Sequence, residues 1–223
     1  MSREKTRLTR EGIAMRIAKE LPDGAYVNLG IGIPTLVANF TPPSKTVIFH
    51  SESGILNCGP LAQEGEEDID LINAGGEFMV PIPGMAFFDS TSAFAMIRGG
   101  HIDVAVLGSL QVSECGDLAN WMIPSRGVGN IGGAMDLAAG AKRLIVAMEH
   151  TDRQGGTKLV KQCSYPLTAK KCVDLVVTDI AVIKVTNNGL RLEEAAPGWT
   201  ADDIQEVTEP RLEIADNLIE MTL

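Results

Sequence analysis

The spacing of hydrophobic positions along the chain alternates between helical and strand-like patterns, which predicts an α/β fold. Ile13, Ile17 and Leu21 recur every four residues with charged residues between them. This spacing predicts a first helix that ends at Pro22-Asp23-Gly24. Short apolar runs between turn residues predict buried strands. Such runs cover residues 26–29, 47–49, 102–107 continuing through 108–112, and 144–148.

Helices and further strands are expected between and after these runs. Pro34 suits the first turn of a helix over 35–40, and residues 87–97 and the segment AMDLAAGA (134–141) are also expected to be helical. A short strand is expected over 70–73, whereas the prolines of 80–84 exclude a central strand. Residues 172–186 predict two strand segments, followed by a hairpin turn at 187–189, a short helix over 201–208 and a tail that resembles a docking arm.

The whole chain, residues 1–223, is expected to form a single domain. This length allows a sizeable core, and the sequence has no repeats, no low-complexity segment and no convincing linker. Apolar runs that alternate with helical patterns favour one α/β domain with a mostly parallel sheet covered by helices.

Composition narrows the classes of function. Hydrophobic residues make up 45% of the chain and charged residues 22%, as in ordinary globular proteins. A net charge of −10 argues against a nucleic-acid surface, but backbone amides or a partner chain could still bind a phosphate-bearing ligand. No apolar run is long enough to span a membrane, and the basic N-terminus has no apolar signal core. We therefore expect a cytoplasmic protein.

The cysteines and histidines do not predict a metal site. Cys58, Cys115, Cys163 and Cys172 show no CxxC spacing and no neighbouring pair of histidines. This pattern favours reduced thiols over a zinc site or a disulfide framework. His50 and His101 do not have the spacing of a ligand pair.

Glu52 is the candidate nucleophile. The apolar run Val47-Ile48-Phe49 ends in His50-Ser51-Glu52-Ser53-Gly54, so a single carboxylate follows a predicted strand. Enzymes with α/β folds place their chemistry at the carboxyl ends of strands. The alternative is that Glu52 is a solvated surface charge, as most glutamates beside turns are.

Two glycine-rich segments are candidates for ligand contact. Gly30-Ile31-Gly32 lies between a predicted strand and a predicted helix, where it could cradle a phosphate or simply make a tight turn. Asn28, a polar residue in that strand, is ambiguous for the same reason. The segment 127–133 has four glycines in seven residues, and its backbone N–H groups could stabilise an oxyanion. A flexible surface turn explains it equally well.

Several strings of the sequence resemble the small (B) subunit of class I coenzyme A transferases, in their 3-oxoacid and short-chain acyl branch. The matching segments are VNLGIGIPTLVANF, SESGIL, DLINAGG, FAMIRGGHIDVAVLG, GDLANWMIP, NIGGAMDL, AMEH and PLTAK. They extend from about residue 10 to about residue 205. The resemblance implies a three-layer α/β/α fold of the type shared with sugar-phosphate isomerases.

The resemblance also assigns site residues. Glu52 matches the covalent nucleophile of the family's Ser-Glu-Asn-Gly motif, in which Ser53 here replaces the asparagine. Gly133 matches the oxyanion donor, and Asn28 matches an active-site asparagine. The remaining residues expected to contact coenzyme A are Gly30, Gly32, Ser53, Gly54, Gly132 and Ala134.

The implied reaction is a ping-pong transfer through a glutamyl-CoA thioester. The carboxylate attacks an acyl-CoA and expels the thiolate, and the thiolate then attacks the resulting mixed anhydride to give the enzyme thioester. An incoming acid reverses these steps. No metal or permanently bound cofactor is required, because coenzyme A is both a substrate and part of the covalent intermediate.

The resemblance further implies a partner and a substrate class. The family divides its active site between two chains, so a large (A) subunit is expected in an A2B2 heterotetramer, and this chain alone is expected to be inactive. Family members that use succinate or 3-oxoadipate often carry lysine at the position of Gly76. Its absence favours acetoacetate with acetate or butyrate. Two alternatives stay open, an acyl-CoA hydrolase and a non-catalytic, sugar-phosphate-binding member of the fold.

Overall fold

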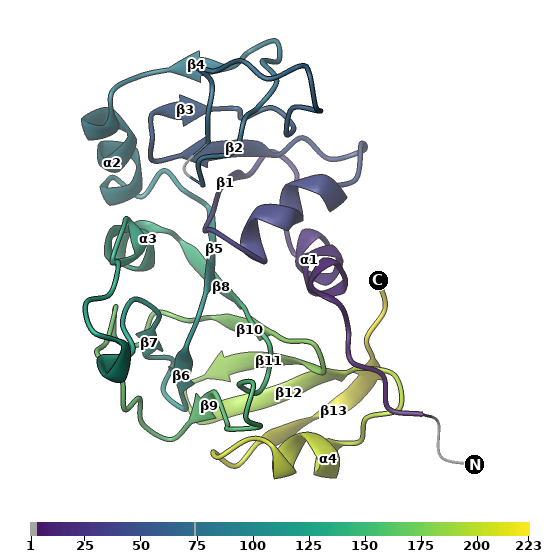
Figure 1. Ribbon diagram of the computed structural model, residues 1–223. Coiled ribbons are helices and arrows are strands. Elements are labelled where there is room, and N and C mark those ends of the chain that lie inside the picture. The colour runs from purple at the N-terminus through teal and green to yellow at the C-terminus, as the bar shows by residue number, and fades with distance from the viewer. Residues whose placement is uncertain (1–3, 74) are drawn as a thin grey trace.

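A ten-stranded sheet runs through the computed structural model, which describes residues 4–73 and 75–223, and helices cover both of its faces (Figure 1). The strand order is β13-β12-β11-β10-β8-β5-β1-β2-β3-β4. Five of the nine neighbouring pairs are parallel, including all four pairs from β10 to β2. The antiparallel pairs lie on both sides of this centre. The prediction of a mostly parallel α/β sheet is therefore confirmed.

The elements have the following bounds in the described part of the chain. The helices are α1 (Arg10–Ala18), α2 (Ser90–Arg98), α3 (Ala134–Gly140) and α4 (Ala201–Glu206), with 3-10 helices η1 (Pro34–Phe40) and η2 (Pro124–Arg126). The large sheet contains β1 (Tyr26–Leu29), β2 (Ile48–Ser51), β3 (Ile55–Leu56), β4 (Ala86–Phe87), β5 (Val104–Gly108), β8 (Arg143–Ala147), β10 (Leu175–Val177), β11 (Ala181–Thr186), β12 (Gly189–Ala195) and β13 (Glu213–Glu220). A separate three-stranded sheet contains β6 (Gln111–Ser113), β7 (Leu118–Ala119) and β9 (Leu159–Val160).

The central strands are apolar on both faces, which produces a three-layer arrangement. In β5, Val104 and Val106 pack into the core on the side of α1 and η1, whereas Ala105 and Leu107 pack into the core on the side of α2 and α3. Because successive strand residues point to opposite faces, a strand buried on both faces must be continuously apolar. Figure 1 shows the two helix pairs on opposite sides of the sheet.

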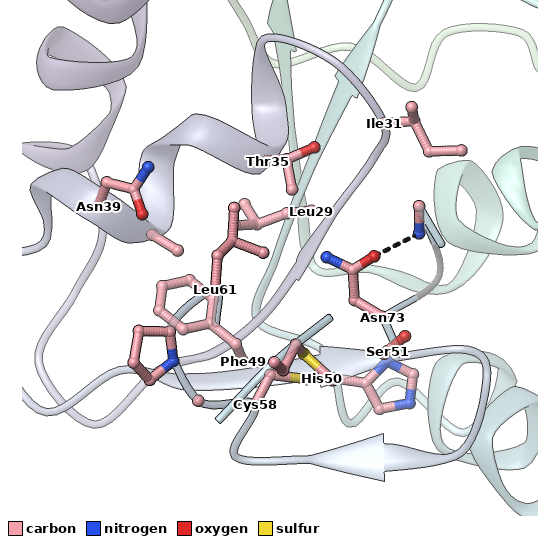
Figure 2. A pocket seen from close by; sticks show the side chains of 15 residues that line it. Leu29, Ile31, Thr35, Asn39, Phe49, His50, Ser51, Cys58, Leu61 and Asn73 are labelled. Atoms are coloured by element: carbon pink, nitrogen blue, oxygen red, sulfur yellow. Dashed lines mark hydrogen bonds between the residues drawn. The ribbon is translucent and has the colours of Figure 1, made fainter. Parts of the chain in front are cut away.

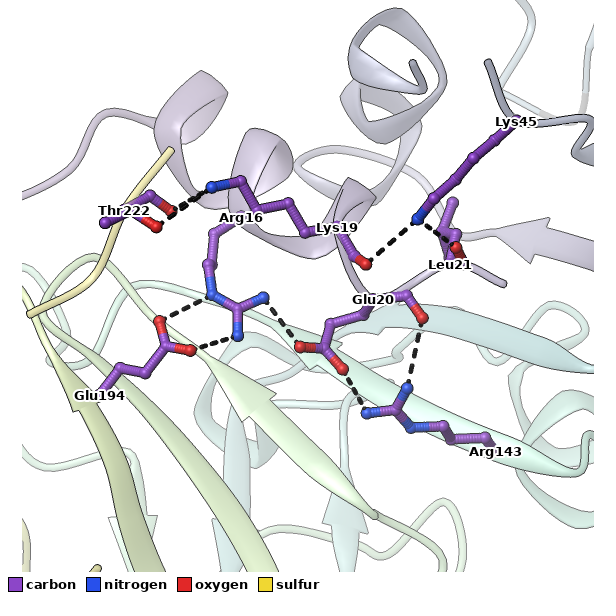
Figure 3. A network of polar contacts seen from close by, with 8 residues as sticks. All are labelled: Arg16, Lys19, Glu20, Leu21, Lys45, Arg143, Glu194 and Thr222. Carbon is purple, nitrogen blue, oxygen red and sulfur yellow. Dashed lines mark hydrogen bonds and ion pairs between the residues drawn. The ribbon is translucent and has the colours of Figure 1, made fainter. Parts of the chain in front are cut away.

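A polar network fixes α1 to the sheet (Figure 3). Arg16, on α1, donates from two nitrogens to the carboxylate of Glu194 on β12, at 2.8 and 2.6 Å. A third nitrogen donates to Glu20, which also accepts a bond from Arg143 on β8. The Arg16 side chain is only 8% exposed. Such a buried, bidentate geometry orders both partners.

Most predicted elements are present, with shifted bounds. The helix expected over 35–40 is the 3-10 helix η1, in a segment where proline, threonine, valine and asparagine disfavour an α-helix. The helix expected over 87–97 begins at Ser90, because Asp89 caps it by accepting a bond from the Ser92 N–H. Phe87 instead belongs to β4.

The run 102–112 divides between two sheets. It forms β5 in the large sheet and then enters β6 in the small one. The hairpin predicted at 187–189 joins β11 and β12, and Gly189 has a φ of +117° there.

The strand predicted over 70–73 is wrong. Only an isolated bridge joins Ile72 to Phe78. The Asp68 carboxylate accepts a bond from the Asp70 N–H, and the Asn73 side chain accepts bonds from the Gly75 and Glu77 N–H groups. Asp and Asn side chains that bind nearby backbone in this way compete with a strand ladder. Ala74, directly after this predicted strand, lies outside the described residues.

The C-terminal tail differs from the prediction of a docking arm. Its residues form β13, which pairs in parallel with β12 at the edge of this chain's own sheet. In the described part of the chain, no helix has the length and apolar character needed to cross a membrane.

Candidate active site

Glu52 lies just beyond the carboxyl end of β2, beside the buried side chain of Asn28 on β1. The two strands are parallel neighbours, and Asn28 is in register with His50. Side chains in register on neighbouring strands share a face of the sheet. The elements therefore bring together a nucleophile candidate from one strand end and an amide from the next.

Hydrogen bonds join these side chains. The Asn28 amide nitrogen donates to the Glu52 carboxylate over 2.9 Å, and it also lies 3.2 Å from the backbone oxygen of His50. The same nitrogen lies 3.1 Å from His50 Nδ1. Asn28 has no exposed surface, whereas Glu52 is partly exposed and can meet a ligand.

Gly133 lies on the other side of the Glu52 carboxylate. A Cβ atom added at position 133 would lie 3.5 Å from Glu52 Oε1 and 3.3 Å from a ring carbon of Phe94. The φ of Gly133 is −86°, which any residue can adopt. An alanine here would be tight against the Phe94 ring and in ordinary contact with Glu52, so the glycine leaves space open beside the carboxylate. Among the described residues, no partner accepts a hydrogen bond from the Gly133 N–H.

At the other predicted positions, the glycines are explained mainly by backbone conformation and by close backbone contacts. Gly54 has a φ of +105°, and a Cβ there would lie 2.0 Å from the Phe88 backbone oxygen. The N–H of Gly30 binds the Val106 carbonyl, and the N–H of Gly32 binds the Thr35 hydroxyl. Their turn therefore joins β1 to η1, and a role in binding coenzyme A stays a prediction.

The remaining candidates flank the nucleophile and Gly133. Ser53 is exposed, and its hydroxyl lies 2.8 Å from that of Ser51. Gly132 has a φ of +49° and open space around it, and Ala134 begins α3. No contact in the described residues tests whether these positions meet coenzyme A.

The surroundings of Glu52 shift the pKa of two neighbouring groups. Burial lowers the pKa of His50, and the nearby Glu52 carboxylate opposes this shift only in part, so the imidazole is neutral near pH 7. Burial raises the pKa of the Cys58 thiol to about 11. Cys58 therefore stays protonated and is a poor rival nucleophile.

A separate cavity of about 80 Å³ lies on the η1 side of the sheet edge (Figure 2). Leu29, Phe49, Leu61 and Met79 supply apolar walls, and Thr35 and Asn73 add polar groups. Leu29 and Phe49 belong to the core on the α1 side, opposite the face that carries Asn28. Ser51 and His50 also line this cavity, but Glu52 does not. It is therefore distinct from the space between Glu52 and Gly133.

The described residues do not suggest a metal centre. Within 4–73 and 75–223, no group of three or more His, Cys, Asp or Glu side chains is arranged to hold an ion. All four cysteines are free thiols.

Known proteins are similar to this chain in both sequence and fold. The family model for coenzyme A transferase matches residues 10–207. The chain is 51% identical to the B subunit of succinyl-CoA:3-ketoacid coenzyme A transferase from Helicobacter pylori, covering 92% of this chain and 99% of the relative. It is 45% identical to the B subunit of 3-oxoadipate CoA-transferase from Acinetobacter baylyi, covering 91% and 94%.

Solved structures support the fold. The acyl-CoA transferase YdiF of Escherichia coli O157:H7 superposes with a TM-score of 0.77 at 22% identity, covering 100% of this chain and 45% of that chain. Glutaconate coenzyme A-transferase of Acidaminococcus fermentans gives a TM-score of 0.71 at 19% identity, covering 98% and 91%. This chain thus corresponds to slightly less than half of YdiF.

The chain belongs to the coenzyme A transferase family, as the small (β) subunit of the class I, 3-oxoacid branch. Its chemistry is the transfer of coenzyme A, and a small subunit of this kind implies a separate A subunit as partner. The three-layer CoA-transferase fold expected from the resemblance is confirmed.

Two neighbours of the site are not predicted by the sequence patterns. The sequence patterns present His50 only as a possible metal ligand, although its place two residues before Glu52 puts both side chains on one face of an extended segment. The two-residue spacing of an extended segment is therefore the sequence signal that places His50 beside Glu52. Phe94 lies near Gly133 through the packing of α2 against α3, and no local pattern indicates this contact.

Proposed function

We propose that the chain, with its A subunit, moves coenzyme A between succinyl-CoA and a 3-oxoacid through a thioester on Glu52. The observation that carries this proposal is the position of the Glu52 carboxylate, held by the Asn28 amide on one oxygen and close to Gly133 at the other. The family membership supports the reaction class, and the names of relatives at 49–51% identity support the substrates.

The first half-reaction begins with attack by the Glu52 carboxylate on the thioester carbonyl of the acyl-CoA. The carbonyl electrons move to oxygen, and collapse of this oxyanion expels the CoA thiolate and leaves a mixed anhydride. The thiolate then attacks the glutamyl carbonyl, which releases the acyl group as a carboxylate. The incoming 3-oxoacid runs the same steps in reverse, so every bond that breaks is matched by one that forms.

Gly133 and Asn28 have separate tasks in this proposal. The unengaged Gly133 N–H stabilises the oxyanions, and one such donor is typically worth about 3–4 kcal/mol in the transition state. Asn28 donates to Glu52 Oε2 and leaves Oε1, the oxygen near Gly133, free to attack. Pre-set orientation of the carboxylate lowers the entropic part of the barrier.

The choice of succinyl-CoA departs from the expectation of acetate or butyrate. That expectation used the missing lysine at Gly76, where the φ of +77° favours glycine. Relatives at 49–51% identity are named for succinyl-CoA and a 3-ketoacid, so their substrates are the stronger guide. Parallel assays of acetoacetate with succinyl-CoA, acetyl-CoA or butyryl-CoA decide this point. Faster turnover with acetyl-CoA or butyryl-CoA would favour acetate or butyrate again.

The mechanism is tested by intact mass spectrometry of the two-subunit enzyme after addition of succinyl-CoA alone. We expect a coenzyme A adduct on this chain that maps to Glu52. Glu52→Gln should give no adduct and no turnover, while Glu66→Gln, on the exposed acidic loop, should behave as wild type. Normal turnover by Glu52→Gln contradicts the proposal. Steady release of free thiol without an acceptor acid would instead identify a hydrolase.

A further inference from the structure

His50 is a buried group for which the proposed reaction has no task. Its side chain is in contact with Asn28, and the residue is only 3% exposed. Its ring stacks on that of Phe88, with the centroids 6.3 Å apart. Phe88 directly precedes Asp89, the N-cap of α2, so α2 and β2 together determine where the imidazole lies.

The contacts of Asn28 determine which of its amide atoms faces the nucleophile. The Glu52 carboxylate and the His50 backbone oxygen can only accept hydrogen bonds, and both lie within 3.2 Å of the same amide atom. That atom must be the nitrogen, because an oxygen there would face two other oxygens.

The same contacts determine the tautomer of His50. Its Nδ1 lies 3.1 Å from the Asn28 nitrogen, which has hydrogens to donate and no lone pair to accept with. Nδ1 must therefore be the unprotonated nitrogen, and the neutral ring carries its proton on Nε2. Burial, which lowers the pKa of His50, keeps the ring in this neutral form.

The unpaired atoms of this pair suggest a positioning task. Asn28 Oδ1 and His50 Nε2 are buried, and neither makes a hydrogen bond of good geometry among the described residues, although the Ala93 backbone interacts with the His50 ring and opposes the fall in its pKa. Buried polar atoms are almost always paired, so a purely structural amide would be expected to use its oxygen as well. Every contact of this Asn28 amide is made by its nitrogen, which faces Glu52.

We propose that His50 is a positioning residue that holds the Asn28 amide with its nitrogen on the Glu52 carboxylate. The proposal rests on the proposed role of Glu52 as nucleophile. Without the Nδ1 acceptor, only the Glu52 carboxylate and the His50 backbone oxygen still hold the amide nitrogen in place, so the flipped amide costs less free energy and is populated more often. In the flipped amide Oδ1 faces the carboxylate, which withdraws the donor and repels the negative charge. His50 touches no reacting atom in this proposal, since its effect passes entirely through Asn28.

Two kinds of substitution separate positioning from packing. His50→Phe keeps an aromatic ring against Phe88 but has no acceptor, and His50→Leu is a second apolar variant should the first not fold. His50→Gln keeps a side-chain oxygen that can accept from Asn28. Thermal unfolding checks that each variant is folded before its kinetics are compared.

The measurements use the reconstituted two-subunit enzyme. We expect His50→Phe to reduce kcat and the single-turnover rate of adduct formation on Glu52 by about tenfold, as for the loss of one hydrogen bond. The KM for acyl-CoA should stay within about twofold, since His50 in this proposal acts on Asn28 and not on the substrate. His50→Gln should recover most of the rate. A wild-type rate in His50→Phe, or equal losses in the Phe and Gln variants, overturns the proposal.

A double-mutant cycle tests whether the effect passes through Asn28. Asn28→Ala alone should slow adduct formation, and adding His50→Phe to it should cause no further loss. Losses that multiply would show that His50 acts independently and would contradict the proposal. Absence of any adduct on wild-type Glu52 would instead reject the proposed function, so the two failures are distinguishable.

Discussion

Asn28 shows how a single residue can mark a site within an apolar strand. It is fully buried between the core residues Val27 and Leu29, where a polar side chain costs free energy unless it is paired. Its nitrogen is paired with Glu52, but its oxygen has no partner among the described residues. An unpaired buried oxygen costs about 1–3 kcal/mol, which makes a purely structural role for this residue difficult to justify.

Gly133→Ala should reduce activity without unfolding the protein. The added methyl group would lie 3.5 Å from Glu52 Oε1 and 3.3 Å from Phe94, so it crowds the space that the thioester needs. We expect kcat to fall at least tenfold, while the melting temperature changes little because the backbone at 133 suits alanine. Steady-state kinetics and thermal unfolding check both parts.

A matched glycine separates crowding from backbone strain. Gly24 has a φ of +75° and open space around the position of a Cβ. Gly24→Ala should therefore lower stability by about 1 kcal/mol and leave kcat unchanged. If Gly133→Ala keeps full activity, the close approach of residue 133 to Glu52 has no part in catalysis.

Individual site residues can be predicted only where they lie in sequence motifs that resemble those of a known family. Glu52, Asn28 and Gly133 are found from motifs that resemble the family's. Local chemistry alone leaves Glu52 open as a surface charge and the glycine loop as a turn. Their convergence depends on the register of β1 with β2 and on the packing of α2 against α3, which are non-local properties.

Secondary-structure elements are tied together by polar side chains that a hydrophobic pattern does not reveal. His150, after β8, is fully buried and lies 3.0 Å from the Thr178 hydroxyl and 2.9 Å from the Thr208 hydroxyl. These threonines lie between β10 and β11 and after α4. The imidazole therefore joins the sheet to the C-terminal helix.

His150 should make stability depend on pH. Burial lowers its pKa to about 4, from an ordinary value of 6.5. A depressed folded-state pKa means that its contribution is complete above pH 6.5 and is lost as the pH falls towards 4. Between pH 7 and pH 5 we expect His150 alone to account for a loss of about 2 kcal/mol in the free energy of unfolding. Denaturant titrations at both pH values measure it.

His150→Gln supplies the comparison. Glutamine can still bind a threonine hydroxyl but does not titrate, so the variant should lose about 2 kcal/mol less between pH 7 and pH 5 than wild type does. His50 also has a lowered pKa and stays in place in this variant, so a smaller pH dependence should persist. An unchanged dependence would remove His150 as its source.

Arg16→Met should loosen α1 from the sheet. The variant keeps the apolar stem but leaves the Glu194 and Glu20 carboxylates without their shared partner. We expect the free energy of unfolding to fall by about 2–3 kcal/mol. This is below the full cost of breaking a buried ion pair, because both carboxylates are partly exposed and Arg143 still binds Glu20. Urea unfolding measures this loss.

The control is an ion pair of the same type on the surface. Arg98 pairs with Asp136 between α2 and α3, and its side chain is 67% exposed. Arg98→Met should leave the urea midpoint close to that of wild type, since exposed pairs are screened by water and salt. Equal losses in both variants would mean that burial of the Arg16 network adds nothing to stability.

The elements themselves are predicted well where periodicity is strong and poorly where side chains bind backbone. The segment 26–29 is apolar apart from Asn28, the segment 144–148 is continuously apolar, and both predicted strands are confirmed. The segment 70–73 looks like another such strand, but Asp68 accepts a bond from the Asp70 N–H, and Asn73 binds the Gly75 N–H just beyond the segment. β13 is missed because its residues are mostly exposed and lack a clear alternation.

At the scale of the whole molecule, the predicted core is present, and exposed apolar side chains lie in two loops near the site. The two core clusters bury the sheet on both faces, as continuous apolar strands require. Around the site, however, Val128 is fully exposed in the loop that leads to Gly133, and Ile31 is 73% exposed in the turn after β1. These two side chains define a rim beside the site, where we expect the A subunit to contact this chain.

We therefore expect the isolated chain to be inactive and the A subunit to cover this rim. Titration of the A subunit into this chain should restore turnover, and native mass spectrometry should give an A2B2 complex. Val128→Asp should weaken association by about tenfold, because it puts an unpaired charge into the interface. Ile219→Asp, on the distant strand β13, is the matched control, with a residue that is 55% exposed. Turnover by the isolated chain, or equal effects of the two substitutions, would show that the rim near Gly133 does not meet the A subunit.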